Sequence, residues 1–198
     1  VLSTVPAAQA RRAAEAAVPL DGLFVDLNSV PPDEKRAICA LTGGVAGVAM
    51  DTVPACGAAV PLLLSGARAS DAAVRLRAVG LNARAVGADP GRCAEIKLTR
   101  SIVVKGLEAV LCEAGAVGDR LGVTAEVLAS LARTYPGFDW PALMAYHIDR
   151  VRRHGERRAD EIEGAAAMAA AAGLDPTLSR AIAAKHRQVA RAPPGKKT

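Results

Sequence analysis

Short and largely apolar runs alternate with helical stretches from residue 1 to about residue 86. Glycine, proline and aspartate bound these runs, a pattern typical of strands buried on both faces of a mostly parallel sheet. The runs lie at residues 1–5, 23–28, 45–50, 59–66 and 81–87. The pattern therefore predicts an α/β region in which strands and helices alternate.

The helices of this region are marked by their ends. One begins after Ser29, where two prolines and two acidic residues occupy the first turn, and it ends at Gly43. Proline has the φ angle of a helical first turn, and carboxylates there oppose the positive end of the helix dipole. Another helix is expected over residues 70–79, with Ser70 as its N-cap. Residues 1–89 are predicted to form one α/β domain.

Helical periodicity continues almost to the end of the chain after residue 90, and no further strand-like run occurs. The pattern predicts helices over residues 91–117, 124–134, 140–154, 157–172 and 176–190. Residues 90–192 are therefore expected to form a helical C-terminal domain, and residues 193–198 a flexible tail. The predicted fold class is α/β followed by all-α.

The helix predicted over residues 91–117 has an apolar and a polar face. The apolar stripe consists of Ile96, Val103, Leu107, Val110, Leu111 and Ala114, and the polar face of Lys97, Ser101, Lys105 and Glu108. Two interpretations of the polar face stay open. Either these side chains face water, or Lys97 lies in a cleft beside the α/β domain. Burial there lowers the pKa of a lysine, which can then exchange a proton with a carbonyl compound.

The apolar stripe and the alanine-rich segment 163–172 need more cover than one small domain supplies. They predict a homodimer that pairs through its C-terminal helices. An aromatic group, which includes Trp140, lies within residues 135–146. It either packs a corner between helices or lines a substrate pocket.

The composition is that of a globular protein, with 51% hydrophobic and 23% charged residues. The net charge of +5 comes entirely from residues 145–198, which carry 11 basic and 6 acidic side chains. The arginine-rich segment 150–158 is interleaved with acidic residues and reads as a solvated helix face, so no nucleic-acid partner is expected. The sequence has no apolar run of the ~18 residues that a membrane span needs. The chain is expected to be cytoplasmic and to bind no membrane.

Local motifs for known chemistries are absent. The sequence contains no G-x-S-x-G, P-loop, H-E-x-x-H or G-x-G-x-x-G pattern. Four cysteines show no C-x-x-C pair, so no metal is expected and the thiols are predicted to be reduced and mostly buried. Of the three histidines, His154 and His186 are expected to be exposed, while His147 lies in the middle of a helix; none is a strong catalytic candidate.

Six stretches together resemble the β-hydroxyacid dehydrogenase family, in its branch of 6-phosphogluconate-dehydrogenase-like NAD(P)-binding proteins. They are residues 3–10, 23–32, 48–51, 59–66, 81–101 and 102–115, of which 96–109 is the most specific. Residues 135–140 and 152–161 add support, so the resemblance covers nearly the whole chain. It implies a partial Rossmann-like sheet domain followed by a helical dimerisation domain.

The resemblance also implies catalytic and substrate-binding residues. Lys97 matches the catalytic lysine of the family's K-x-x-x-N pattern, and Ser101 stands where the asparagine would be. A hydroxyl has one donor where an amide has two, so the substrate class is expected to differ from simple hydroxy acids. The family's D-A-P-V-S-G-G substrate segment corresponds to residues 51–57, whose serine has no counterpart here. The implied substrate-binding residues are Pro54, Ala55, Cys56 and Trp140, and by counting the family's Lys-Asp pair falls on Asp160 and Glu161.

Residues 3–10 resemble the fourth strand of the family's nucleotide-binding domain and the loop after it. The first βαβ unit, with the glycine-rich turn that binds the pyrophosphate of NAD or NADP, is therefore expected to lie upstream of Val1. Within this chain, the resemblance places the nicotinamide contacts at Val5, Pro6, Asn28 and Ser29. The residues that would distinguish NAD from NADP are not among them.

Three functional hypotheses follow. The first is an NAD(P)-dependent oxidoreductase that acts on a small carbonyl, imine or hydroxy compound, with proton transfer by Lys97. The second is a homologue without nicotinamide binding that uses Lys97 for acid/base chemistry on a small metabolite. The third is a non-catalytic dimeric binding module. The sequence leaves the substrate open.

Overall fold

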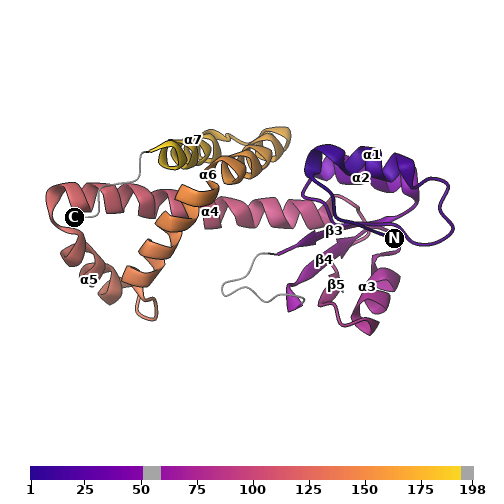
Figure 1. Ribbon diagram of the computed structural model, residues 1–198, viewed down its shortest axis with the longest axis horizontal. Coiled ribbons are helices and arrows are strands. Elements are labelled where there is room, and N and C mark those ends of the chain that lie inside the picture. The colour runs from indigo at the N-terminus through magenta and orange to yellow at the C-terminus, as the bar shows by residue number, and fades with distance from the viewer. Residues whose placement is uncertain (51–58, 193–198) are drawn as a thin grey trace. The chain divides into compact units, whose positions relative to one another are not determined.

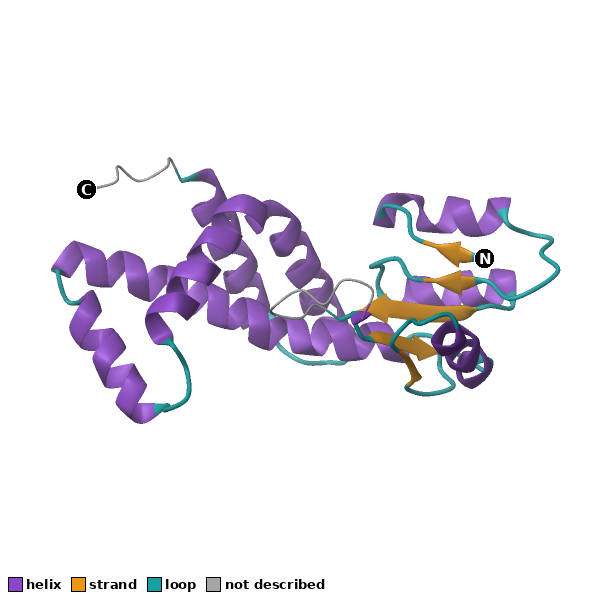
Figure 2. Cartoon of the chain, turned by 60° about the horizontal axis from the view of Figure 1, so that its bottom comes forward, coloured by secondary structure: helices purple, strands orange, loops and turns teal. Residues whose placement is uncertain are grey.

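The computed structural model describes residues 1–50 and 59–192. The chain divides into two compact units, Val1–Lys97 and Leu98–Thr198. Five strands form one sheet in the first unit (Figures 1 and 2). They are β1 Leu2–Ser3, β2 Val25–Asp26, β3 Val45–Ala49, β4 Leu62–Ser65 and β5 Ala83–Ala85, and they lie in sequence order.

The sheet is mostly parallel, as the apolar runs predict, and the exception is the antiparallel pair β3–β4. In its register Ala46 faces Ser65 and Ala49 faces Leu62. A parallel pair needs a crossover of a dozen or more residues, usually with a helix, whereas an antiparallel pair can be joined by a shorter connection. Residues 50–61 separate β3 from β4, a shorter connection than that between the strands of any parallel pair in this sheet, which fits the antiparallel arrangement.

Helices cover both faces of this sheet. The 3-10 turn η1 (Ala7–Gln9), α1 (Ala10–Ala16) and α2 (Pro32–Thr42) lie on one side in Figure 1, and α3 (Ala69–Ala78) on the other. Alternate strand residues point to opposite faces. Val45, Leu62 and Leu64 pack against α3, whereas Val48 and Leu63 pack in the cluster that contains Cys39 of α2.

The predicted ends of α2 are confirmed, whereas the predicted start of α3 is wrong. Pro32 opens α2, and Gly43 ends it in the left-handed conformation with φ 60°. Helix α3 begins at Ala69 with Arg68 as N-cap, so Ser70 lies within its first turn.

The second unit is helical. Helix α4 (Arg92–Leu121) crosses from the first unit into the second, and α5 (Thr124–Thr134), α6 (Trp140–Ala171) and α7 (Thr177–Arg191) follow. The two helices predicted over residues 140–154 and 157–172 are one continuous helix, α6. Gly155 does not interrupt it, because its lack of a side chain allows the backbone of α7 to approach: a Cβ there would lie 2.6 Å from the carbonyl oxygen of His186.

The two faces of α4 are the reverse of the expectation over much of the second unit. Val103 and Val110 of the predicted buried stripe are 72% and 63% exposed. One interpretation of the polar face was that its side chains face water. They do not, since Ser101, Lys105 and Glu108 are 6%, 3% and 0% exposed. Partners on α4, α6 and α7 pair with their polar atoms, which compensates for the burial. Leu111 keeps its predicted place and packs with Trp140 and Met144.

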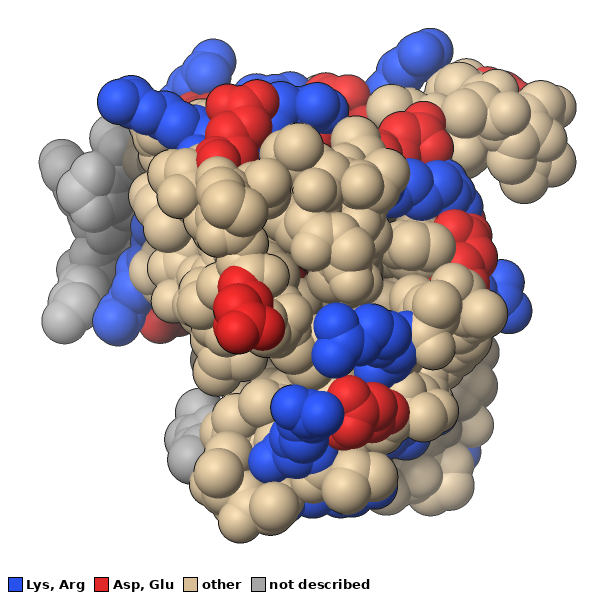
Figure 3. All heavy atoms as spheres, turned by 90° about the vertical axis from the view of Figure 1, so that its right-hand side faces the viewer, with Lys and Arg blue, Asp and Glu red and all other residues tan. Residues whose placement is uncertain are grey.

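Charges of both signs are interspersed on the face shown in Figure 3. In the first unit, arginines pair with nearby carboxylates, for example Arg11 with Glu34 and Arg75 with Asp71. In the arginine-rich segment of α6, Arg153 and Arg157 are exposed as predicted, but Arg158 is 1% exposed. Within residues 1–50 and 59–192, no helix is long and apolar enough to cross a membrane.

Candidate functional site

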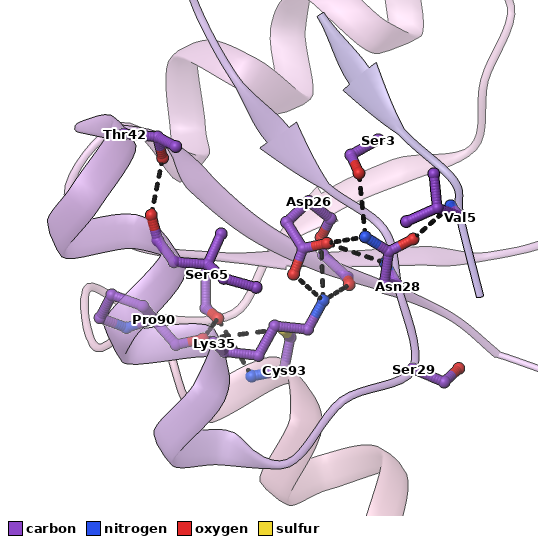
Figure 4. Close-up of polar contacts among 12 residues, drawn as sticks. Ser3, Val5, Asp26, Asn28, Ser29, Lys35, Thr42, Ser65, Pro90 and Cys93 are labelled. Carbon is purple, nitrogen blue, oxygen red and sulfur yellow. Dashed lines mark hydrogen bonds and ion pairs between the residues drawn. The ribbon is translucent and has the colours of Figure 1, made fainter. Parts of the chain in front are cut away.

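A buried polar cluster lies where the parallel strands β1 and β2 end (Figure 4). Asp26 is the last residue of β2 and is 0% exposed. The ammonium group of Lys35, also 0% exposed, donates to the Asp26 side chain at 2.8 Å, to the Asp26 carbonyl at 2.9 Å and to the Gly47 carbonyl at 2.8 Å. All three N–H donors of the lysine are satisfied, so helix α2 is fixed to β2 and β3 at this edge of the sheet.

Asn28 connects this cluster to the loop after β1. Its amide nitrogen donates to the hydroxyl of Ser3 at 2.9 Å and to the Asp26 carboxylate, and its oxygen accepts from the backbone N–H of Val5 at 2.7 Å. Asn28 is 3% exposed, and both of its amide donors are used inside the protein. Among the predicted nicotinamide contacts, Asn28 therefore holds the segment of Val5 and Pro6 in place.

Ser29 points away from this cluster and is exposed (Figure 4). The ammonium group of Lys97 donates to its hydroxyl oxygen at 2.8 Å. The structure thus brings together the predicted catalytic lysine and one predicted nicotinamide contact, 68 residues apart in the sequence. Lys97 is half-buried.

The start of α4 is held firmly, which fixes the position of Lys97. The hydroxyl of Ser65 donates to the Pro90 carbonyl at 2.8 Å and accepts from the N–H of Cys93 at 3.1 Å. Arg36 of α2 donates to Asp89 at 2.9 Å and to Glu95 at 2.6 Å. These hydrogen bonds from Arg36 hold the pKa of Asp89 below its ordinary value.

Ser101 follows Lys97 by one helical turn and belongs to the second unit. Its hydroxyl oxygen accepts from Lys105 at 3.1 Å. Lys105 also pairs with Glu161 at 2.9 Å, one of the two residues matched by counting to the family's Lys-Asp pair. The other, Asp160, pairs with Arg187 at 3.1 Å.

Of the other predicted substrate residues, Pro54, Ala55 and Cys56 lie outside the described residues. Trp140 is 8% exposed, and its indole nitrogen donates to the Tyr135 carbonyl at 3.4 Å. The Phe138 ring lies 5.6 Å from that of Trp140, so these aromatic residues pack against one another.

Three cysteines are buried as predicted, and Cys56 is outside the described residues. Burial raises the pKa of Cys39 to about 12 and that of Cys112 to about 11, so neither thiol is a nucleophile near neutral pH. Within the described part of the chain, no group of His, Cys, Asp and Glu side chains could hold a metal ion.

Two buried ionic groups were not predicted from the sequence. One is Asp26 with Lys35, whose only sequence signal is an acidic residue inside an apolar strand. The other surrounds Glu108, where Arg158 and His186 converge. The prediction that His186 is exposed is wrong, since it is 0% exposed, whereas His154 is exposed as expected.

Comparison with known proteins agrees with this architecture. A model of a domain of unknown function, DUF1932, matches residues 119–189. The solved structure of the conserved protein MTH1747, reported to be similar to 3-hydroxyacid dehydrogenases, is 30% identical to this chain. Its alignment covers 96% of this chain and 74% of that chain, with a TM-score of 0.81. This chain belongs to the 3-hydroxyacid dehydrogenase-like family.

The family is the one indicated by the β-hydroxyacid dehydrogenase resemblance, which is thereby confirmed together with the fold class. A conserved hypothetical protein from Sinorhizobium meliloti 1021 is 39% identical, with a TM-score of 0.79 over 94% of this chain. The 3-hydroxyisobutyrate dehydrogenase of Mycobacterium tuberculosis, solved with L-serine, shares the fold with a TM-score of 0.75 over 96% of this chain and 73% of that chain, at 17% identity. An uncharacterized 28.5 kDa protein from Methanothermus fervidus is 27% identical over 71% of this chain.

This 3-hydroxyacid dehydrogenase-like chain is shorter than its relatives. It spans 55% of the Methanothermus fervidus protein and 65% of the Sinorhizobium meliloti protein, less than two thirds of each.

Proposed function

We propose that this chain carries the proton-transfer residue and the nicotinamide-side contacts of an NAD(P)-dependent oxidoreductase. The observation that supports it is the hydrogen bond between Lys97 and Ser29, 2.8 Å long, beside the carboxyl end of β2. Open α/β sheets bind their ligands outside the carboxyl ends of the strands. A lysine held at that edge is suitably placed to exchange a proton with a bound compound.

The residues of this edge fit one end of the cofactor. Val5, Pro6 and Ser29 follow β1 and β2, and the buried amide of Asn28 keeps the first of these segments in place. They would contact the nicotinamide ring, which supplies or accepts hydride when the cofactor is bound. The sequence contains no G-x-G-x-x-G turn for the pyrophosphate, so the fit of these residues extends to the nicotinamide end alone.

Lys97 performs the proton transfer in this proposal. As a carbonyl oxygen or imine nitrogen of the substrate gains negative charge, the ammonium group donates a proton to it, and in the reverse direction the amine takes one from a hydroxyl. The hydroxyl of Ser29 accepts one N–H of Lys97 and so directs the group.

The substrate class is a small carbonyl, imine or hydroxy compound. L-serine is the first probe, because it is the compound present in the Mycobacterium tuberculosis 3-hydroxyisobutyrate dehydrogenase structure.

The test combines cofactor binding with substitution of the lysine. Titration of the 198-residue chain with NADPH, followed by nicotinamide fluorescence, is expected to give saturable binding. Oxidation of L-serine with NAD⁺ or NADP⁺ is expected to fall by about 10²- to 10⁴-fold in kcat in Lys97→Ala, the usual contribution of one general acid/base group. Lys185→Ala is the matched control, since that lysine lies on α7 and pairs with Glu113.

Absence of NADPH binding at millimolar concentration would contradict the nicotinamide-dependent function. The alternative, acid/base chemistry without nicotinamide, would then be supported if enolisation of a carbonyl compound, followed by hydrogen-deuterium exchange, depended on Lys97. If Lys97→Ala changed neither reaction, the binding-module hypothesis would remain.

A further inference from the structure

A cavity lies within the second unit, between the C-terminal part of α4 and helices α6 and α7. Its volume is about 550 Å³, and ligand pockets measure about 300–1,000 Å³. The apolar part of its wall includes Gly115, Ala116, Val117, Leu121, Ile148 and Val189. The lining residues lie within residues 112–192, so the cavity belongs to the second unit alone.

Charged side chains also line this cavity, and cations outnumber acids by three to two. They are Arg120, Arg152, Lys185, Glu113 and Asp119. The ammonium group of Lys185 lies 2.7 Å from the carboxylate of Glu113, so these two charges compensate each other. Neither Arg120 nor Arg152 has an ion-pair partner among residues 1–50 and 59–192. Asp119 could balance one guanidinium charge at most, so the lining keeps a net positive charge.

Arg152 is suitably placed to hold a negatively charged group in the cavity. It follows Ile148 by one helical turn, so the guanidinium and part of the apolar wall share one face of α6. On α4, its charge acts to lower the pKa of Cys112, although burial outweighs this effect and raises that pKa to about 11. The side chain of Arg152 is exposed, so a ligand from solvent can reach it. A guanidinium binds a carboxylate through two parallel N–H···O hydrogen bonds.

We propose that this cavity binds a small amphipathic anion, a monocarboxylate whose aliphatic chain lies along the apolar wall and whose head group pairs with Arg152. Val117 and Leu121 of that wall are 51% and 67% exposed, and a bound chain would cover them. Removal of this apolar surface from water favours binding, and the carboxylate neutralises the unpaired guanidinium. The site is separate from the proposed proton transfer, because it uses neither Lys97 nor a cofactor.

The first experiment compares three probes by isothermal titration calorimetry of the 198-residue chain without cofactor. Octanoate is expected to bind one-to-one with a Kd below about 1 mM. Acetate, which has the charge without the chain, and 1-octanol, which has the chain without the charge, are each expected to bind at least about tenfold more weakly. An increase in NaCl from about 0.05 M to about 0.5 M should weaken octanoate binding but not octanol binding, because salt screens the head group.

Two substitutions locate the ligand. Arg152→Gln is expected to weaken octanoate binding by about tenfold, the loss of a charge-assisted hydrogen bond, and to change octanol binding by less than about twofold. The matched control is Arg153→Gln at the next residue, an exposed arginine that pairs with Asp149 at 2.9 Å, and it should leave both affinities unchanged. Ala116→Trp fills the cavity and should weaken the binding of both probes.

Each contrary result would overturn the inference. Absence of saturable octanoate binding to the wild-type chain would show that the cavity takes no such anion. Equal affinities for octanoate and octanol, or an unchanged octanoate affinity in Arg152→Gln, would show that Arg152 does not select the charge. If Ala116→Trp does not fold, alkylation of Ala116→Cys by N-ethylmaleimide decides the location: saturating octanoate should slow it by about tenfold, and an unchanged rate would place the ligand elsewhere.

Discussion

Glu108 is a buried carboxylate whose charge several neighbours compensate. Arg158 donates to both of its oxygens, one at 2.8 Å, and the His186 ring lies 3.0 Å away. His147 is 3.5 Å from the carboxylate, and the other nitrogen of His186 is 2.9 Å from the Ile182 carbonyl. Burial by itself would raise the pKa of Glu108, but the two histidines and Arg158 outweigh it and hold the pKa well below its ordinary value.

Glu108→Gln is expected to destabilise the protein by about 3–5 kcal/mol, because it leaves the buried guanidinium of Arg158 without a counter-charge. Urea unfolding followed by circular dichroism measures this change. The matched control is Glu113→Gln on the same helix, whose side chain is 62% exposed and whose ion pair with Lys185 contributes little. A Glu108→Gln variant as stable as the control would contradict the expectation.

The lowered pKa of Glu108 makes the stability of the protein depend on pH. The pKa of Glu108 is lower in the folded protein than its ordinary value of 4.5, so the unfolded chain binds more protons in acid. The stabilisation is present above pH 4.5 and decreases as the pH falls below it. The difference in unfolding free energy between wild type and Glu108→Gln should therefore narrow in that range.

The family resemblance pointed to residues that the structure brings together, whereas buried polar pairs were not predicted. Lys97 and Ser29 were each assigned from the resemblance, and the structure places them 2.8 Å apart. The pairing of Asp26 with Lys35 was not predicted, because no periodicity indicates which polar residues will be buried together. The contact between Ser101 and Lys105 has the i, i+4 spacing of one helix face, but neither interpretation of that face predicted that the two side chains are buried together.

At the scale of the element, the close packing of α6 against α7 depends on Gly155. A Cβ at Gly155 would lie 2.6 Å from the His186 carbonyl oxygen and 2.8 Å from the Ala190 side chain, so α6 and α7 are in close contact there. Gly155→Ala must push the two helices apart and is expected to cost about 1–3 kcal/mol.

Gly164→Ala on the same helix is the control. Its Cβ would have Leu98 at 3.8 Å, an ordinary contact, and alanine in a helix interior is expected to stabilise by about 0.5–1 kcal/mol. Thermal unfolding midpoints of the two variants should thus shift in opposite directions. A shift of both in the same direction would contradict the close approach at Gly155.

Elements were predicted well where turn chemistry marks their ends. The helix over residues 124–134 has the predicted bounds, and the ends of α2 were indicated by its prolines and by Gly43. The break predicted near Gly155 was wrong. Glycine often ends a helix, but Gly155 lies inside α6 and allows α7 to pack closely against it. The faces of α4 were misassigned because buried ion pairs with other helices override the simple rule of apolar residues inside.

At the scale of the whole molecule, the hydrophobic pattern predicted the succession of five strands along the chain and the change to helices after residue 90. The pattern did not predict the antiparallel pair β3–β4, because apolar runs do not specify strand direction. The division into units at Lys97–Leu98 falls inside α4, so that one helix carries Lys97 in the first unit and Ser101 in the second.

The exposed apolar face of α4 supports the prediction of a homodimer. Val103, Val110 and Val117 are 72%, 63% and 51% exposed, and Leu178 of α7 is 67% exposed. These residues line a groove of about 780 Å³ within the second unit. Exposed apolar surface of this extent is a common feature of subunit interfaces.

Size-exclusion chromatography with light scattering is expected to give twice the chain mass of 20.2 kDa at micromolar concentration. The double substitution Val103→Asp/Val110→Asp should convert the dimer to a monomer, because a dimer would then bury two charges per subunit without counter-charges. Val74→Asp, at a 58% exposed valine of α3, is the matched control and should leave the mass unchanged. A wild-type monomer, or a dimer that survives the double substitution, would show that this face of α4 does not mediate self-association.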